Sequence, residues 1–333
     1  MAIKVGINGL GRIGRCVARA IIEEGYDDIQ LVAANGSAAN DHHAHLLQYD
    51  SVHGRFQNKI TFDEQGIDMG RGRFTVTHER DPKKIDWAGL GVDIVLECTG
   101  AFNTREAASV HLAQGAKKVL ISAPAGDDCP TFVHGVNCAG ITREHTVFSV
   151  GSCTTNCLAP VAKVLDDTFG ISSGYMTTIH AYTGDQNLVD GSHKDLQRAR
   201  AAGLSMVPTK TGAAKAIGLV LPALAGKLSG TAIRVPTANV SLVDLTVITQ
   251  RPATKEAVNA ALTAAANGPM KRVLKVTSEP LVSIDFNHDH ASAIADLKGT
   301  AVMDSLVRVA AWYDNEWGFS CRMLDLARVA AAA

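Results

Sequence analysis

The sequence predicts an α/β protein with two domains: a doubly wound parallel sheet, then an α+β domain with a mixed or antiparallel sheet. The chain has 333 residues, which is enough for about two domains of ordinary size. Strand-like runs alternate with helical patterns over roughly the first 150 residues, as is typical of a parallel sheet. The later runs are longer and are set among fewer helices, which favours a mixed sheet.

Four candidate strands lie in the first half of the chain. Residues 3–7 form a short apolar run, and a glycine-rich turn and the helical pattern of residues 15–22 follow it. Further strand-like runs cover residues 30–34, 92–98 and 118–122. Strands joined through helices in this way lie parallel in one sheet.

The second half has a different pattern. Its β-rich runs cover residues 175–180, 231–235 and 240–247. Residues 318–333 form an amphipathic helical pattern that could pack back on the first domain. We therefore expect one domain over residues 1–152, completed by the helix 318–333, and a second domain over residues 153–317.

Composition excludes several classes of protein. The chain is 46% hydrophobic and 20% charged with a net charge of -1, so no broad basic field for nucleic acid is present. No apolar run approaches the ~20 residues that span a bilayer, and the N-terminus lacks the pattern of a signal peptide, so we expect a cytoplasmic protein without membrane contact. Seven cysteines include no C-x-x-C pair, which indicates a reducing compartment and no metal site.

The glycine turn after the first strand matches a dinucleotide-binding motif. Gly9, Gly11 and Gly14 follow the pattern G-x-G-x-x-G between a strand and a helix. The first glycine permits the tight turn, the second admits a pyrophosphate close to the backbone, and the third lets helix and strand pack. The first domain is therefore expected to be a Rossmann domain.

The end of the second strand lacks the acidic residue that usually binds the ribose hydroxyls. Asn35, Gly36 and Ser37 stand there instead. Without a carboxylate the site does not repel a 2′-phosphate, and Ser37 can donate a hydrogen bond to it. We expect NADP to be accepted, or even preferred, while binding of NAD through Asn35 or a backbone group remains the alternative.

Cys153 is a candidate nucleophile. It follows a strand-like run and precedes the helical pattern of residues 161–165, so it is expected near a helix N-terminus, where the dipole favours a thiolate. The N–H groups of the same helix start could stabilise an oxyanion. A cysteine without further context is more often a small buried apolar residue.

The motifs along almost the whole chain identify a family. The sequence resembles phosphorylating glyceraldehyde-3-phosphate dehydrogenases in INGLGRIGR, YDSVHGRF, ECTGAF, SAPAGDDCPTFVHGVN, SCTTNCLAP, HAYTGDQ, TGAAKAIGLVLP, RVPTANVSLVDL and WYDNEWGFS. The resemblance implies that Cys153 attacks the aldehyde of glyceraldehyde 3-phosphate and that His180 is the base. Hydride passes to NADP or NAD, and inorganic phosphate then releases an acyl phosphate, 1,3-bisphosphoglycerate.

The resemblance also implies ligand-binding residues. Two phosphate groups need local donors in a nearly neutral protein. For the substrate phosphate it implies Thr183, Asp185 and Arg234, with Arg198 as a further candidate, and for the attacking phosphate Ser152, Thr154, Thr211 and Gly212. For the cofactor it implies Arg12, Ile13, Arg80, Ser122 and Asn315 beside the glycines.

Three positions depart from the usual family pattern. Gly36 replaces the aspartate that is usual in members using NAD. Ser192, after Gly191, replaces the proline that is common in NAD-specific members. In a homotetramer, which the resemblance implies, this loop reaches the neighbouring adenosine, so Ser192 is a second candidate contact for a 2′-phosphate. Val150-Gly151 replaces the common Asn-Ala before Ser152, which leaves the support of that loop open.

Two alternatives remain at this point. An erythrose-4-phosphate dehydrogenase resembles this family, but the retained motifs Thr183-Gly184-Asp185-Gln186 and Thr211-Gly212 favour the three-carbon substrate. A catalytically silent binding protein could keep the same fold. The retained pair Cys153 and His180 argues against loss of catalysis.

Overall fold

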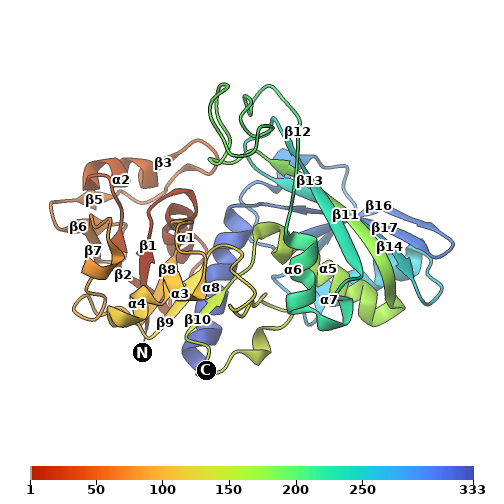
Figure 1. Ribbon diagram of the computed structural model, residues 1–333, viewed down its shortest axis with the longest axis horizontal. Coiled ribbons are helices and arrows are strands. Elements are labelled where there is room, and N and C mark those ends of the chain that lie inside the picture. Colours follow the sequence, from red (N-terminus) through yellow and green to blue (C-terminus); the bar gives the residue numbers. More distant parts are fainter. Residues whose placement is uncertain (1) are drawn as a thin grey trace. The chain divides into compact units, whose positions relative to one another are not determined.

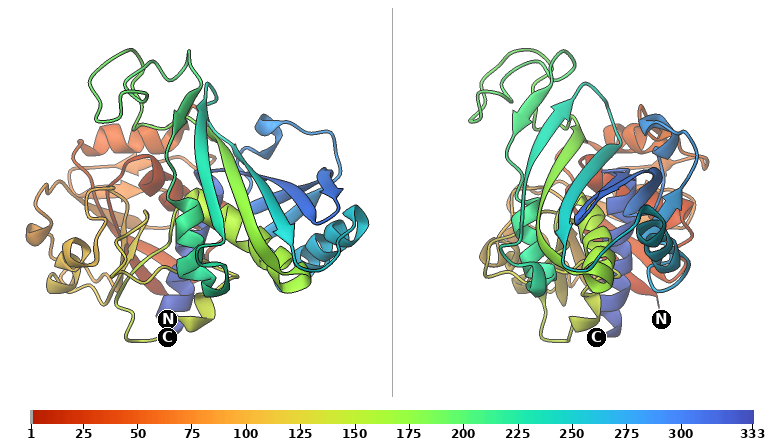
Figure 2. Two further views of the ribbon diagram at one scale, coloured as in Figure 1. Left: turned by 45° about the vertical axis from the view of Figure 1, so that its right-hand side comes forward. Right: turned by 90° about the vertical axis from the view of Figure 1, so that its right-hand side faces the viewer.

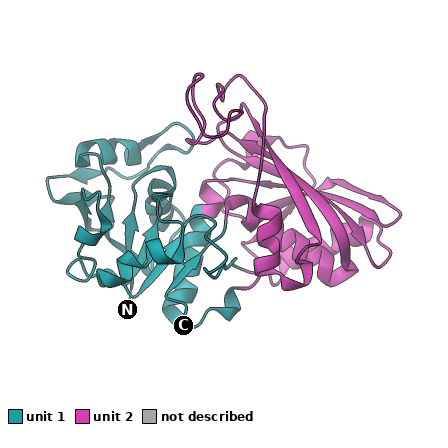
Figure 3. Cartoon of the chain, viewed as in Figure 1, with its two compact units in different colours: residues 1–134, 138–151, 320–333 teal, residues 135–137, 152–319 magenta. Residues whose placement is uncertain are grey.

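The computed structural model describes residues 2–333, and it divides into two compact units (Figure 3). The first unit contains Met1–His134, Cys138–Gly151 and Ser320–Ala333, and the second contains Gly135–Asn137 and Ser152–Phe319. None of the helices within residues 2–333 is long and apolar enough to cross a membrane.

The first unit is built on an eight-stranded sheet (Figure 1). Its strands are β1 (Ile3–Asn8), β2 (Ile29–Asn35), β5 (Thr61–Phe62), β6 (Gly66–Asp68), β7 (Arg73–Thr77), β8 (Ile94–Glu97), β9 (Lys118–Ile121) and β10 (Val147–Ser149). Their order is β10-β9-β8-β1-β2-β7-β6-β5. All pairs from β10 to β7 are parallel, and β6 and β5 extend the sheet as antiparallel strands.

This order confirms the doubly wound parallel sheet. β7-β2-β1-β8-β9-β10 is the arrangement of two mononucleotide-binding halves, whose switch point lies between β1 and β8. The four predicted strands are β1, β2, β8 and β9. β10 corresponds to the strand-like run that was expected before Cys153, whereas β7 was not predicted.

Short helices complete the first unit. They are α1 (Arg12–Glu23), α2 (Asn40–Gln48), α3 (Arg105–Ala108) and α4 (Val110–Ala113), with 3-10 turns η1 (Pro82–Lys84) and η2 (Cys138–Gly140). A two-stranded hairpin, β3 (Tyr49–Asp50) with β4 (Gly54–Arg55), follows α2. α1 is buried around its whole circumference over residues 16–21, as is typical of a helix that lies inside the core.

A buried polar network lies at the carboxyl ends of the central strands. Glu97 at the end of β8 accepts hydrogen bonds from the Nδ2 of Asn8 (2.6 Å), the Nε2 of His111 (2.9 Å) and the backbone N–H of Thr99 (2.7 Å). Trp87 donates to the Nδ1 of His111 (3.0 Å), so the proton of this imidazole is on Nε2. Glu97 and His111 are almost fully buried, and a hydrogen bond to a charged group contributes about 1.5–3 kcal/mol.

The second unit is built on a seven-stranded mixed sheet, which was also predicted. Its strands are β11 (Ile171–Ala181), β12 (Val207–Thr209), β13 (Leu228–Val235), β14 (Ser241–Thr249), β15 (Leu274–Thr277), β16 (Ala293–Met303) and β17 (Leu306–Tyr313). The order is β12-β13-β11-β14-β17-β16-β15, with β11–β13 and β15–β16 as the parallel pairs. Figure 2 shows the long strands β11, β13 and β14 running side by side.

Three helices pack against this second sheet: α5 (Cys153–Phe169), α6 (Ala213–Val220) and α7 (Lys255–Asn267). The 3-10 turns η3 (Pro222–Leu224) and η4 (Ser283–Phe286) lie in its connections. α5 is buried along most of its length, and its Pro160 is tolerated eight positions into a helix that tertiary packing holds. The start of α5 and the end of β11 thus have fixed positions within one unit.

The final helix α8 (Trp317–Ala332) has its residues from Ser320 onward in the first unit. The Tyr26 hydroxyl donates to the carbonyl oxygen of Cys321 (3.1 Å) and to the Oδ1 of Asp325 (3.0 Å). Arg328 forms an ion pair with Asp28. The end of the chain therefore belongs to the same core as its beginning.

Candidate functional site

The glycine turn between β1 and α1 has the geometry that a bound pyrophosphate needs. Gly9 has φ +102, a conformation that favours glycine. A Cβ on Gly14 would overlap the carbonyl oxygen of Gly9, whereas a Cβ on Gly11 would meet nothing within 4 Å. The turn is therefore tight where strand and helix pack and open at the second glycine, as dinucleotide binding requires.

This turn lies in a cavity of about 450 Å³ at the ends of β1 and β2. The cavity residues among those predicted for the cofactor are Gly9, Gly11, Gly36, Ser37 and Arg80. Other lining residues are Asn8, Leu10, Asn35, His43, Glu79, Pro82, Cys98, Thr99, Ala101 and Phe102. The residues present fit a dinucleotide, because backbone N–H groups, glycines and few side chains surround the space.

Other predicted cofactor residues lie outside this cavity wall. Arg12, Ile13 and Gly14 are in the first turn of α1, where Arg12 donates to the Oδ1 of Asp50 (2.9 Å). Ser122 follows β9, and its backbone N–H donates to the carbonyl oxygen of Glu97 (3.0 Å).

Asn35 has no free hydrogen-bonding capacity for a ribose. Its Nδ2 donates to the Oδ1 of Asn8 and to the carbonyl oxygen of Glu79, both at 2.9 Å. Its Oδ1 accepts from the Thr77 hydroxyl and from the Glu79 backbone N–H, again at 2.9 Å. A primary amide has two donors and two acceptor positions, so the alternative in which the Asn35 side chain binds NAD loses its support.

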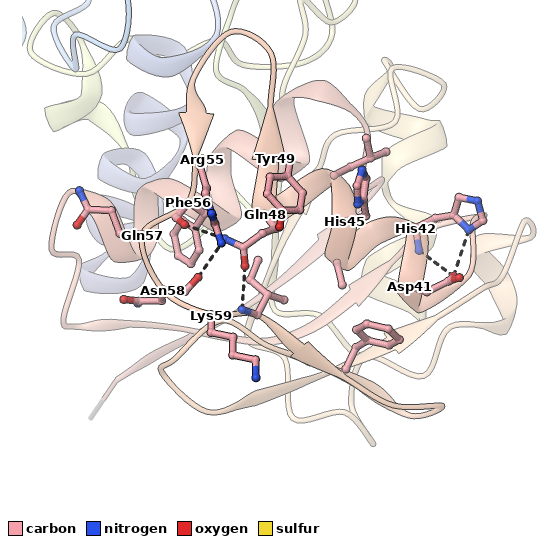
Figure 4. Close-up of a pocket in the computed structure, with 14 residues that line it drawn as sticks. Asp41, His42, His45, Gln48, Tyr49, Arg55, Phe56, Gln57, Asn58 and Lys59 are labelled. Atoms are coloured by element: carbon pink, nitrogen blue, oxygen red, sulfur yellow. Dashed lines mark hydrogen bonds and ion pairs between the residues drawn. The ribbon is translucent and has the colours of Figure 1, made fainter.

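A second, larger cavity lies elsewhere in the first unit (Figure 4). It has a volume of about 1010 Å³ and lies over the exposed side of α2, where His42, His45 and Tyr49 line it. Gln48 donates to the carbonyl oxygens of Phe56 (2.7 Å) and Asn58 (3.2 Å). These bonds hold the following loop on α2, and none of the predicted site residues lines this cavity.

Cys153 is the first residue of α5. The hydroxyl of Ser152 caps the helix by accepting the backbone N–H of Thr155 (3.0 Å), as Ser commonly does at this position. The Cys153 Sγ lies 3.5 Å from the Nε2 of His180 in β11. The structure therefore brings together two side chains that are 27 residues apart in the sequence.

The orientation of His180 is set by its own backbone neighbour. Its Nδ1 lies 2.7 Å from the carbonyl oxygen of Ala181. A carbonyl only accepts, so Nδ1 carries the proton and the lone pair of Nε2 points at the sulfur. The Nη1 of Arg234 also lies 3.2 Å from this Nδ1, but its two hydrogens go to the carbonyl oxygen of Ala181 and the hydroxyl of Thr183. This is the tautomer that can take a proton from Cys153 or from a group bound to it.

The electrostatics of the pair keep both groups neutral. Burial, followed by the nearby Arg234, lowers the pKa of His180 to about 3, against the opposing effect of its bond to Ala181. Burial also raises the pKa of the Cys153 thiol, while Arg234 and the helix start at Thr154 lower it. The helix terminus alone therefore does not make the sulfur an anion, because desolvation opposes it.

Arg234 in β13 is the cation of this site. Its Nη1 donates to the carbonyl oxygen of Ala181 (3.0 Å) and to the hydroxyl of Thr183 (3.2 Å). Its Nε is buried without a partner, and it forms no ion pair with a carboxylate within residues 2–333. A partly buried guanidinium with free donors and no acidic partner is typical of an anion site.

Comparisons with known proteins agree with this geometry. Residues 3–105 match the family model described as glyceraldehyde 3-phosphate dehydrogenase, NAD binding domain, and residues 152–315 match the C-terminal domain of the same family. A glyceraldehyde-3-phosphate dehydrogenase of Xanthobacter flavus is 58% identical over 98% of both chains. A protein of the same name from Cereibacter sphaeroides is 57% identical, again over 98% of both chains. The chain belongs to the glyceraldehyde-3-phosphate dehydrogenase family.

Family membership makes this protein a dehydrogenase with an NAD(P)-binding first domain. The other predicted phosphate residues can now be placed. Asp185 forms an ion pair with Arg198, whose Nε donates to the Thr209 hydroxyl (3.0 Å). Thr211 and Gly212 directly precede α6, with Gly212 at its N-cap, and they make no hydrogen bond to Cys153, His180 or Arg234 within the described chain.

The sequence did not identify Tyr313 as a residue of the site. Its hydroxyl lies 2.9 Å from that of Thr154 and 2.8 Å from that of Thr178, and its ring meets His180 edge to face. It thereby joins α5, β11 and β17 behind the thiol. Its position in the motif WYDNEWGFS, two residues before Asn315, was the available signal.

Asn315 and Ser192 both lie in the second unit. The Oδ1 of Asn315 accepts from the Ser241 hydroxyl (2.8 Å), which also accepts the Ala181 backbone N–H (3.1 Å). Asn315 is therefore linked to the strand end that holds His180. Ser192 is exposed in the segment between β11 and β12.

Replacing Arg234 by leucine should slow alkylation of Cys153 by iodoacetamide at pH 7. Loss of the cation raises the pKa of the thiol further and so lowers its thiolate fraction, by about tenfold for each unit of pKa. Mass spectrometry of the labelled peptide distinguishes Cys153 from the buried Cys157. Arg200→Leu, which removes an exposed arginine paired with Asp190, is the matched control. Equal rates in both variants would contradict the role of Arg234.

Proposed function

We propose that this protein oxidises D-glyceraldehyde 3-phosphate to 1,3-bisphosphoglycerate, reversibly and with inorganic phosphate as second substrate. The observation that carries this proposal is the contact between the Cys153 sulfur and the lone pair of His180 beside an unpaired Arg234. A thiol, a base and an anion site within one unit are what phosphorylating oxidation of a phosphorylated aldehyde needs. The relatives named above carry the name of this activity.

The chain's own residues account for the proton and covalent steps. The Cys153 sulfur bonds to the aldehyde carbon as its proton passes to the Nε2 of His180 and from there to the new hydroxyl, giving a thiohemiacetal. His180 takes the hydroxyl proton again as the carbon is oxidised to a thioester. The bound nicotinamide supplies the acceptor for the two electrons of this step. Phosphate oxygen then attacks the thioester carbon, the C–S bond breaks, and the acyl phosphate leaves.

The anion contacts divide between two groups of residues. Arg234 and Thr183 are one hydrogen-bonded group, which we assign to the substrate phosphate together with Asp185 and Arg198. Ser152, Thr154, Thr211 and Gly212 are assigned to the attacking phosphate, since the first two flank Cys153 at the start of α5. Backbone N–H groups at that helix start also face a developing oxyanion.

Cys153→Ser should reduce turnover at least ~1000-fold, and His180→Asn should reduce it by about 10²–10⁴-fold, because the nucleophile or its base is lost. The measurement is dinucleotide reduction with glyceraldehyde 3-phosphate, with and without inorganic phosphate. Erythrose 4-phosphate is the comparison substrate. Full turnover by Cys153→Ser, no dependence on phosphate, or faster turnover of the four-carbon aldehyde would overturn the proposal.

We infer further that the cofactor site accepts NADP at least as well as NAD. Gly36 after β2 brings no carboxylate against a 2′-phosphate, the amide of Asn35 is already saturated, and Ser37 is exposed at the cavity. Ser192 has the free surface needed for the contact from a neighbouring subunit that the family resemblance suggested.

Parallel kinetics should show a kcat/KM for NADP at least equal to that for NAD. Gly36→Asp should lower NADP use about tenfold or more relative to NAD, since it adds a repelling charge and its Cβ displaces His43. A wild-type preference for NAD of a hundredfold would refute this cofactor assignment.

We also propose a homotetramer in the cytoplasm. The segment between β11 and β12 exposes five large apolar side chains: Leu188, Val189, Leu196, Leu204 and Met206. Such a concentration in one loop is typical of an interface. None of the seven cysteines forms a disulfide within residues 2–333, which agrees with a reducing compartment. Light scattering that gives the 35.1 kDa mass of one chain would contradict the oligomer.

A further inference from the structure

His43 is a buried imidazole without hydrogen-bond partners. It lies on α2 with 5% of its surface exposed, and neither Nδ1 nor Nε2 has a partner among residues 2–333. Leaving a polar group unsatisfied in the interior is costly, and native proteins do so rarely and with a reason, such as a ligand. The isolated chain therefore holds this side chain at a cost to its stability.

The imidazole of His43 lies beside Gly36, the position in the cofactor site that has no side chain. His43 lines the same cavity as Gly9, Gly11 and Gly36. A Cβ on Gly36 would lie 2.8 Å from the Cε1 of His43 and closer still to its Nε2. The imidazole thus occupies the space into which a side chain at position 36 would extend. In dinucleotide-binding folds, that side chain meets the 2′-position of the adenine ribose.

The charges around His43 favour an anion. Burial is the main cause that lowers the pKa of His43. The nearby backbone of Gly36 raises this pKa, and His78, Arg15 and His42 lower it. Of these three groups, the guanidinium of Arg15 on α1 carries a permanent positive charge. Glu79 is the one carboxylate in the cavity wall, and Arg80 beside it is the one guanidinium. A phosphate that arrives here is attracted to the guanidinium groups of Arg15 and Arg80 and favours the charged imidazole.

We propose that His43 is the residue that distinguishes NADP from NAD, with its Nε2–H donating a hydrogen bond to the 2′-phosphate. This rests on the proposed use of NADP at the cavity. The role differs from that of Ser37, because the imidazole comes from α2 and is buried before the ligand arrives. His43 acts on the choice of cofactor and touches none of the reacting atoms of the substrate.

The test is binding of NAD and NADP to the full-length protein by titration calorimetry. His43→Leu should reduce the ratio of NADP to NAD affinity about tenfold, the loss expected for one hydrogen bond to a charged group. The same variant without cofactor should melt about 2–4 °C higher, because two unsatisfied nitrogens are removed. A side chain with a purely structural role would not combine greater stability with weaker discrimination.

Two further variants make the result interpretable. His45→Leu removes another histidine of α2, but one that lines the separate cavity of Figure 4, so it should leave the ratio as in the wild type. His43→Gln keeps a donor without a positive charge and should recover part of the lost ratio. His43→Gln also tests the proposal if His43→Leu does not fold.

The outcomes separate the two proposals. A wild-type protein that binds NAD a hundredfold more tightly than NADP overturns both the cofactor assignment and the role of His43. A wild type that binds NADP well, with a ratio that neither His43→Leu nor His43→Gln changes, overturns the role of His43 alone. If His45→Leu lowers the ratio of NADP to NAD affinity as much as His43→Leu does, the role of His43 is also overturned. The effect is then not specific to the buried imidazole.

Discussion

The hydrogen bond from the Nδ1 of His180 to the carbonyl oxygen of Ala181 determines what the site can do. It places the ring proton on the side away from Cys153 and leaves a basic nitrogen 3.5 Å from the sulfur. Burial and the Arg234 charge keep that nitrogen unprotonated at neutral pH. One backbone carbonyl at the end of β11 therefore selects the tautomer, and the proposed proton transfers depend on it.

The two binding regions meet the need for polar groups in opposite ways. In the first unit, Asn8, Asn35 and Glu97 form hydrogen bonds with one another across the ends of β1, β2 and β8. The donors of these bonds are therefore already used within the protein. In the second unit, Arg234 keeps a buried Nε without a partner. We therefore expect ligand selectivity to depend on the polar groups that have no hydrogen-bond partner in the protein, because binding supplies the hydrogen bonds that they lack.

The sequence predicted the elements whose signals are local. The apolar runs of β1, β2, β8 and β9 and the glycine turn were identified because periodicity and glycine spacing depend only on neighbouring residues. The pairing of Cys153 with His180 came from the family resemblance, since no local pattern joins residues so far apart. His43 was not identified, because on a helix its position matches that of the buried Leu47, and only coordinates show that its nitrogens lack partners. Tyr313 was not identified either, because only the folded structure brings its hydroxyl close to those of Thr154 and Thr178.

The assignment of Ser320–Ala333 to the first unit has a consequence for biogenesis. Tyr26, near the start of the chain, bonds to Cys321 and Asp325 in the last helix. Nascent domains usually fold in order as they leave the ribosome, but this one lacks a piece of its own core until residues 320–333 have been synthesised. The second unit is synthesised in full before the first can close, so the intervening period leaves apolar surface open to chaperones.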